Sequence, residues 1–239
     1  MGAMFVFLKL VLAHMIGDFI LQFEELYRLK VKSRLGHFFH ALIHFFCSLL
    51  LVFPYLDIPF IWIFISVISV IHYFQDLLKY RIEGKHPKQI FWCFTIDQTV
   101  HFLFIASILL FPTHSAERGF PQFPVLNFFY SGNTATLYAI AYVTATFKGS
   151  YFLHALRRSF LKKTRPDHFI TSLEVWHGLA ERGFVVFMFL LNISAPALMI
   201  AWPLVALLRV SSKKLRNLTD FLLSFIYAAA VGGFFRIWL

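Results

Sequence analysis

Residues 58–79 read IPFIWIFISVISVIHYFQDLLK, an apolar run in which His72 and Asp76 appear only near the end. A stretch of about 20 mainly apolar residues is long enough to cross the hydrocarbon core of a membrane as a helix. Residues four apart lie on one face of a helix, so His72 and Asp76 project together. Ionisable groups inside a membrane are costly and mark functional sites by default. This run therefore predicts a membrane-spanning helix and a functional site at His72 and Asp76.

The composition of the whole chain agrees with a membrane protein. It is 59% hydrophobic, 19% aromatic and only 14% charged, whereas soluble domains are about 45–50% apolar and about 25% charged. Cys47 and Cys93 both lie in apolar runs and indicate no disulfide framework. The first apolar stretch carries His14 and Asp18 and lacks a small-residue cleavage site, so we interpret it as a retained span and not as a signal peptide.

The predicted fold is an all-α polytopic transmembrane bundle of about eight spans. We expect one membrane domain over residues 1–239, made of a four-span half (1–112) that carries the polar pairs and a second four-span half (134–239). The expected spans are residues 3–23, 37–54, 58–79, 89–112, 134–156, 170–191, 194–210 and 218–237. Residues 183–208 could instead form one long helix, but an even number of crossings keeps the flanking basic loops in one compartment.

The basic residues predict the orientation. Of the 22 Lys and Arg residues, 17 lie in the alternate loops after spans one, three, five and seven or at the span ends that lead into them. The positive-inside rule places these loops in the cytoplasm and both termini outside. Basic loops beside a membrane suit anionic lipid headgroups, so we expect membrane lipids as partners and no nucleic acid.

Three other spans repeat the spacing of four. They are the spans with His14 and Asp18, with His40 and His44, and with Asp97 and His101. With the predicted orientation, all four pairs fall in the cytoplasmic half of the bilayer at overlapping depths, so a bundle could bring them to one cavity.

Imidazole and carboxylate together are ligands for divalent metals such as zinc, manganese or iron. The predicted ligands are His14, Asp18, His40, His44, His72, Asp76, Asp97 and His101. The predicted acid–base groups are Asp18, Asp97 and Glu181, and the predicted supporting groups are Gln22, Lys79, Gln98, His177 and Arg182. We expect Lys79 mainly to reach the interface and His37 to be solvated. A buried polar network without metal, or a proton or ion path, are the alternatives.

Five sequence elements carry a resemblance to a known family. They are Leu12 to Gln22 (LAHMIGDFILQ), the His40–His44 pair, IHYFQDLLK ending at Lys79, Asp97-Gln98 with His101, and Gly178 to Arg182 (GLAER). They resemble domain-of-unknown-function family 3307, an uncharacterised family of bacterial inner-membrane proteins. The resemblance implies a multi-pass protein of the bacterial inner membrane and implies no established reaction.

These patterns favour a membrane-embedded, metal-dependent hydrolase of a lipid or amphipathic ester at the cytoplasmic leaflet. A bound metal would lower the pKa of water to ~7 for such hydrolysis. A transporter of a divalent cation or of a proton-coupled solute is the first alternative. A membrane scaffold that binds a cytoplasmic partner through the basic loops is the second.

Overall fold

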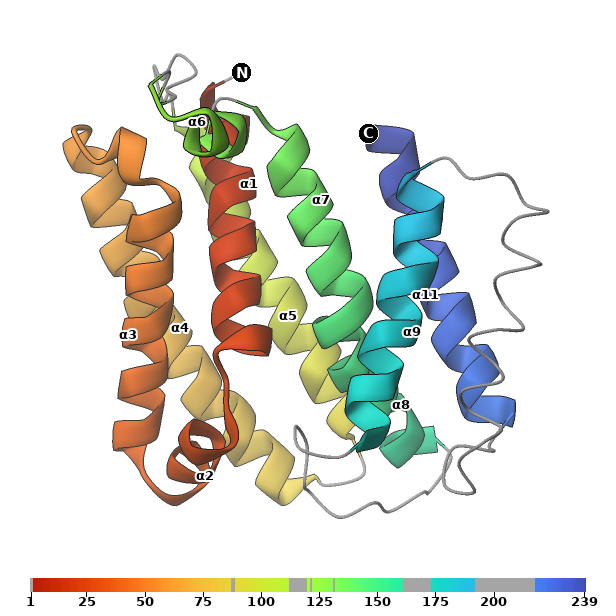
Figure 1. The fold of residues 1–239 in the computed structure, drawn as a ribbon. Helices are drawn as coiled ribbons and strands as arrows, with labels where there is room; N and C mark the ends of the chain where they lie inside the picture. Colours follow the sequence, from red (N-terminus) through yellow and green to blue (C-terminus); the bar gives the residue numbers. More distant parts are fainter. Residues whose placement is uncertain are drawn as a thin grey trace. The chain divides into compact units, whose positions relative to one another are not determined.

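The computed structural model describes residues 2–86, 89–111, 120, 122–130, 132–160, 173–191 and 218–239 (Figure 1). Within these ranges the regular elements are all helical, which confirms the all-α fold. The chain forms two compact units. Unit 1 comprises Met1–Ile140 and Ala155–Lys163, and unit 2 comprises Ala141–His154 and Thr164–Leu239. Each unit is described by itself.

Unit 1 is built on four apolar helices. They are α1 (Gly2–Met15), α3 (Arg34–Leu51), α4 (Pro59–Lys85) and α5 (Ile90–Ala106). Each packs against two of the others, because α1 contacts α3 and α5 while α4 contacts the same two helices (Figure 1). Helix α1 is apolar on all sides and is the most buried of the four, as expected for a helix that is hydrophobic all round.

The short helix α2 (Glu24–Lys32) crosses one end of this bundle, where we expected only a basic loop. Acidic residues in its first turn and basic residues in its last turn suit the helix dipole. A Cβ at Gly36 would lie 2.3 Å from the backbone nitrogen of Lys30, so only glycine lets α3 begin this close to α2. Because of this tight turn, the Lys30 side chain is buried at this end of the bundle, with only 3% of the residue exposed.

The opposite end of unit 1 carries α6 (Pro124–Tyr130) and the start of α7 (Thr134–Val143). Lys9 of α1 is fully buried and donates to the carbonyl oxygen of Phe129 at 2.9 Å and to Thr136 Oγ1 at 3.3 Å. The Tyr130 hydroxyl donates to the Leu50 carbonyl at 2.6 Å. These bonds fasten α6 to α1 and α3. The spacing patterns of the sequence do not indicate this role for Lys9.

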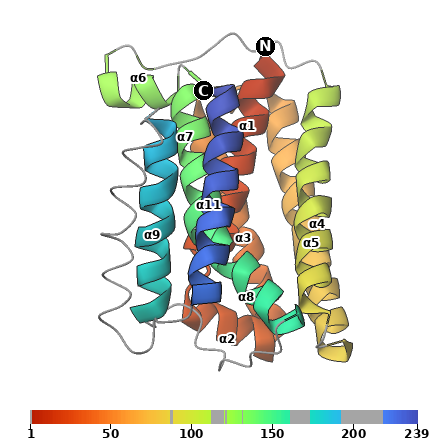
Figure 2. The same ribbon diagram turned by 90° about the vertical axis from the view of Figure 1, so that its right-hand side faces the viewer.

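Unit 2 contains α9 (Leu173–Leu190) packed against α11 (Leu218–Trp238) (Figure 2). Both contact the π-helical turn η4 (Thr144–Lys148), which joins α7 to α8 (Gly149–Phe160). Arg182 of α9 is buried and donates to the carbonyl oxygens of Ala145 at 2.8 Å and Thr146 at 3.0 Å. Arg182 therefore satisfies backbone groups of the π-turn.

Five segments of the described chain are long and apolar enough to cross a membrane: Ala3–Ile20, Arg34–Leu51, Pro59–Lys85, Ile90–Leu110 and Phe221–Trp238. Their outward faces expose large apolar side chains such as Ile63, Phe74 and Leu103, as a lipid-facing surface requires. They coincide with the first four predicted spans and the last. The predicted span 194–210 lies outside the described residues, and the total of eight spans and the orientation of the termini stay predictions.

Candidate metal centre

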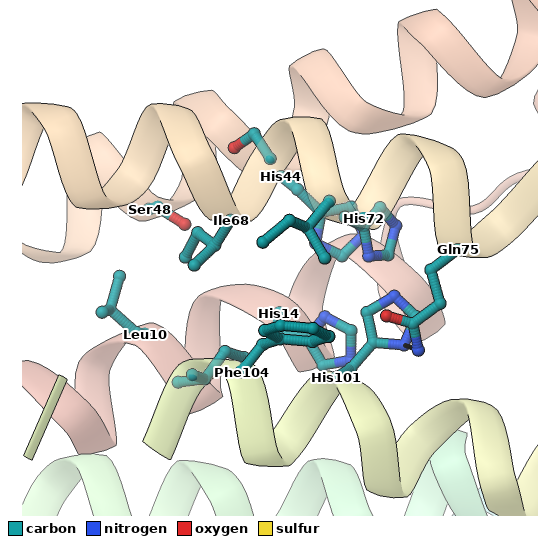
Figure 3. A pocket seen from close by; sticks show the side chains of 12 residues that line it. Leu10, His14, His44, Ser48, Ile68, His72, Gln75, His101 and Phe104 are labelled. Atoms are coloured by element: carbon teal, nitrogen blue, oxygen red, sulfur yellow. Dashed lines mark hydrogen bonds between the residues drawn. The ribbon is translucent and has the colours of Figure 1, made fainter. Parts of the chain in front are cut away.

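Five imidazoles and one carboxylate converge inside unit 1. Figure 3 shows four of these imidazoles gathered between α1, α3, α4 and α5. Neighbouring ring centroids are between 3.9 and 5.5 Å apart. All six side chains belong to buried residues: His14, Asp18, His40, His44, His72 and His101. The polar pairs of four spans were predicted to meet, and this prediction is confirmed for these six of the eight residues.

Asp18 is the centre of the cluster. Its Oδ1 atom lies 3.1 Å from His40 Nε2, 3.0 Å from His44 Nε2 and 3.8 Å from His72 Nε2. Its Oδ2 atom lies 3.3 Å from His14 Nε2 and accepts a hydrogen bond from the side-chain amide of Gln98 at 2.9 Å. We call His14, Asp18, His40, His44, His72 and His101 together the Asp18 cluster; Gln98 is not part of it.

A π-helical turn places Asp18. Helix α1 does not continue regularly after Met15 but passes into η1 (Ile16–Ile20), which contains Asp18. Such π-turns are rare and are frequent at functional sites. A Cβ at Gly17 would lie 2.7 Å from the Nε2 and Cε1 atoms of His44, so glycine is what admits the His44 ring beside this turn.

The donor atoms of the cluster fit a divalent metal. One donor atom from each of His14, Asp18, His44 and His72 lies within 4.8 Å of the others. Both ring nitrogens of His72 are buried without a hydrogen-bond partner in the described residues. Buried polar groups normally have partners, and an exception needs an explanation such as an ion. Imidazole nitrogens and a carboxylate are the donor set that zinc, manganese and iron accept in proteins.

The two other predicted carboxylates are paired with lysines. Asp76 Oδ2 lies 2.8 Å from Lys30 Nζ and 2.7 Å from His37 Nδ1. Asp97 Oδ2 lies 3.2 Å from Lys79 Nζ. In contrast, no lysine or arginine of the described chain pairs with Asp18. Asp76 and Asp97 are thus outside the group whose donor atoms come together, although both had been predicted as ligands.

Three of the predicted supporting groups, Gln22, Gln98 and Lys79, form polar contacts within unit 1. Gln98 donates to both Asp18 and Asp97, and Gln22 accepts a hydrogen bond from Lys30 at 2.8 Å. Lys79 pairs with Asp97, so the expectation of a mainly interfacial role was wrong.

The expectation of a solvated His37 was also wrong, because this residue is only 3% exposed and holds Asp76. His37 lies three residues before His40 and seven before His44, and this spacing on one helix face could have revealed it.

A comparison with protein-family models matches residues 6–123 to a family described as a protein of unknown function (DUF3307). Residues 6–123 belong to the DUF3307 family. Comparisons with curated proteins and with solved structures found no match. The DUF3307 region contains the whole Asp18 cluster and both lysine–carboxylate pairs.

A small cavity adjoins the cluster within the DUF3307 region. Its volume is about 30 Å³, which is enough for one or two water molecules. Its walls combine four imidazoles with apolar side chains and two serines (Figure 3). The principal lining residues are His14, His44, His72, His101, Leu10, Ser48, Ile68, Ser69 and Phe104.

Three predicted residues lie in unit 2, outside the DUF3307 match. Glu181 is 2% exposed and Arg182 is 4% exposed, whereas His177 is half-buried. Besides the π-turn carbonyls, Arg182 donates to the hydroxyls of Ser150 and Ser224. The bonds of Arg182 tie η4, α8, α9 and α11 together, and the catalytic role of Glu181 stays a prediction.

Proposed function

We propose that this protein is a membrane-embedded metalloenzyme that hydrolyses a lipid or amphipathic ester. His14, Asp18, His44 and His72 would hold the divalent metal. Such a metal supplies a water molecule with a pKa of ~7 and polarises the substrate carbonyl. His40 would orient the Asp18 carboxylate through their 3.1 Å contact.

One observation carries the proposal: three of the four ligand residues also form the wall of the cavity. His14, His44 and His72 line it, and the cavity has room for a water molecule. Catalytic metal sites keep a coordination position open to water or substrate, whereas structural sites are closed by protein ligands. A cavity beside the ligands therefore favours catalysis over a purely structural metal.

The surroundings of the cavity favour an apolar substrate. Leu10 of α1, Ile68 of α4 and Phe104 of α5 line it. Helices α4 and α5 also expose Val70 and Leu103 on their outer faces. A substrate with an acyl chain could enter from the bilayer by separating α4 from α5. The cavity is too small for an ester in its present form, so this entry requires the helices to move.

The charges on unit 1 support a cytoplasmic position for the α2 end. Arg28 and Lys32 of α2 and Arg81 and Lys85 of α4 carry basic charge at that end, and cytoplasmic loops are enriched in such residues. By this reasoning the Asp18 cluster would serve the inner leaflet of a bacterial cytoplasmic membrane.

Transport of a divalent cation or of protons is the second candidate. A chain of polar side chains leads from Asp18 through Gln98 and Asp97 to Lys79 near the α2 end. Chains of this kind serve as ion or proton paths in transporters. In a transporter the same metal site would be a transit site and not a catalytic one.

The experiment compares the two functions on one preparation. Purified protein is placed in vesicles with a fluorogenic lipid ester, and both ester cleavage and zinc flux are recorded with and without a chelator. We expect metal-dependent cleavage that His44→Ala abolishes and that His86→Ala, an exposed residue, leaves intact. Zinc flux without cleavage would replace the enzyme by the transporter, and neither signal would overturn both.

A further inference from the structure

Two histidines of the Asp18 cluster remain after one metal has been assigned its ligands. His40 is fully buried, and its ring lies 4.6 Å from that of His44 and 5.0 Å from that of His72. His101 is 5% exposed, and its ring lies 4.8 Å from that of His14 and 4.3 Å from that of His72. A single ion with the four assigned ligands and one water molecule is already five-coordinate, so it leaves these two imidazoles without a metal.

His101 has a donor atom ready for an ion. Its Nε2 atom is buried without a hydrogen-bond partner in the described residues. His101 Nδ1 lies 2.8 Å from the carbonyl oxygen of Asp97 and 2.8 Å from the side-chain amide of Gln75. In the tautomer with the proton on Nδ1, His101 donates to this carbonyl oxygen, and Nε2 then presents a lone pair. A backbone carbonyl on the distal nitrogen is the usual way in which proteins orient a metal-binding imidazole. Leaving this nitrogen buried and unpaired would cost free energy.

The carboxylate of Asp18 faces two groups of imidazoles. Its Oδ1 atom is next to His40 and His44, at 3.1 and 3.0 Å, with His72 at 3.8 Å. Its Oδ2 atom is next to His14 at 3.3 Å, and the His14 ring stacks on that of His101. A carboxylate with donors gathered at both oxygens has the arrangement of a bridging ligand, and bridged pairs of ions lie about 3.5–4 Å apart.

We propose that the Asp18 cluster holds two divalent metal ions bridged by the Asp18 carboxylate. His40, His44 and His72 bind the ion at Oδ1, and His14 and His101 bind the ion at Oδ2. Asp97 lies beside the distal nitrogen of His101, with its Oδ1 atom 3.5 Å from His101 Nδ1. The inference rests on the proposed metal binding and specifies a centre with two ions in place of one.

The two-metal centre gives all five imidazoles the same kind of role. Five imidazole nitrogens and two carboxylate oxygens supply seven donors, four to the ion at Oδ1 and three to the ion at Oδ2. An octahedral ion such as Mn²⁺ would therefore keep positions for water at both places. The cavity wall contains His14 and His101 from one group and His44 and His72 from the other. A water molecule there would be within reach of both groups, as in enzymes that clamp a reacting oxygen between two ions.

The test measures the metal stoichiometry of the full chain in detergent. The protein is stripped with a chelator, titrated to saturation with Mn²⁺, and analysed for bound manganese and for its electron paramagnetic resonance spectrum. We expect two ions per chain with the spectrum of a spin-coupled pair. His101→Ala should bind one ion with an uncoupled spectrum, and the exposed control His86→Ala should still bind two.

The outcomes separate this inference from the proposed function. One ion in the wild-type chain, unchanged in His101→Ala, would overturn the two-metal centre and leave a single metal site. Two ions without spin coupling would overturn the Asp18 bridge. No bound ion in the wild-type chain would overturn metal binding altogether. The wild-type stoichiometry decides the matter even if a variant fails to fold.

Discussion

Three buried carboxylates of the bundle obtain their compensation in two different ways. Asp76 and Asp97 each pair with a lysine, Lys30 at 2.8 Å and Lys79 at 3.2 Å. Asp18 has no such cation in the described chain and is surrounded by four imidazoles and the amide of Gln98. All three are nearly inaccessible, so the difference lies in their partners and not in their burial.

The difference separates carboxylates that are paired with a lysine from a carboxylate that is surrounded by possible metal ligands. A buried charge requires an opposite charge or a metal. Lys30 and Lys79 satisfy this requirement for Asp76 and Asp97, which makes those pairs complete without a ligand. No lysine or arginine of the described chain meets this requirement for Asp18. Its neighbours other than Gln98 are imidazoles, which can bind a metal. An imidazolium ion is the other source of positive charge, and the experiments below distinguish it from a metal.

The largest expected effect is the loss of metal on Asp18→Asn. An amide supplies no negative charge and only one acceptor oxygen, so the metal content of the purified protein should fall to background. Elemental analysis measures it. Asp76→Asn is the matched control, because it removes an equally buried carboxylate that is paired with Lys30. Equal loss of metal in both variants would remove the distinction between the two kinds of carboxylate.

The second largest effect is a loss of folding stability when a lysine–carboxylate pair is broken. Lys30→Met leaves Asp76 buried beside His37 alone, and breaking a buried ion pair costs about 3–5 kcal/mol. Unfolding in mixed micelles would measure the loss, with Asp76→Asn added as the rescue. Lys79→Met should cost less, because the Lys79 side chain is 20% exposed and that of Lys30 is 2% exposed. The reverse order would contradict the assignment of Lys30 as the deeper structural cation.

A smaller effect is expected from Gly17→Ala. The new methyl group would lie 2.7 Å from the His44 ring and displace it. Changes in groups that position ligands typically cost about 10–100-fold in metal affinity, which competition with a fluorescent zinc chelator measures. Gly84→Ala is the control, because a Cβ there meets no atom within 4 Å. Unchanged zinc affinity in Gly17→Ala would mean that His44 is not a ligand.

The smallest effect should follow Gln98→Leu. This change removes the hydrogen bond to Asp18 Oδ2 at 2.9 Å but keeps every proposed ligand, so we expect about a tenfold weaker zinc affinity. The exposed Gln89 provides the control in Gln89→Leu. A complete loss of zinc in Gln98→Leu would show that Gln98 is itself a ligand.

The sequence predicted the four helices of unit 1 and most of the cluster, because both depend on local patterns. Apolar length indicates a span, and a spacing of four places His14 and Asp18, or His40 and His44, on one face. The distribution of Lys and Arg predicts that the pairs lie toward the cytoplasmic side, and this orientation stays a prediction.

The partners of Asp76 and Asp97 could not be predicted in this way. Lys30 reaches Asp76 because Gly36 allows α2 to turn tightly against α3. Lys79 of α4 pairs with Asp97 of the neighbouring helix α5. These contacts depend on helix rotation and on a π-turn at Asp18, and hydrophobic periodicity does not determine either. Sequence spacing therefore indicated which residues gather, but not which carboxylate lacks a cation.

X-ray absorption spectroscopy of the zinc-loaded protein tests the central claim most directly. The Asp18 cluster predicts a first shell of nitrogen and oxygen at about 2.0–2.2 Å, with the scattering pattern of several imidazoles, and the loss of this signal in Asp18→Asn. Sulfur at about 2.3 Å would point to Cys47 or Cys93. A sulfur shell, or a chain that retains no zinc, would contradict the claim that Asp18 and its histidines form a metal centre.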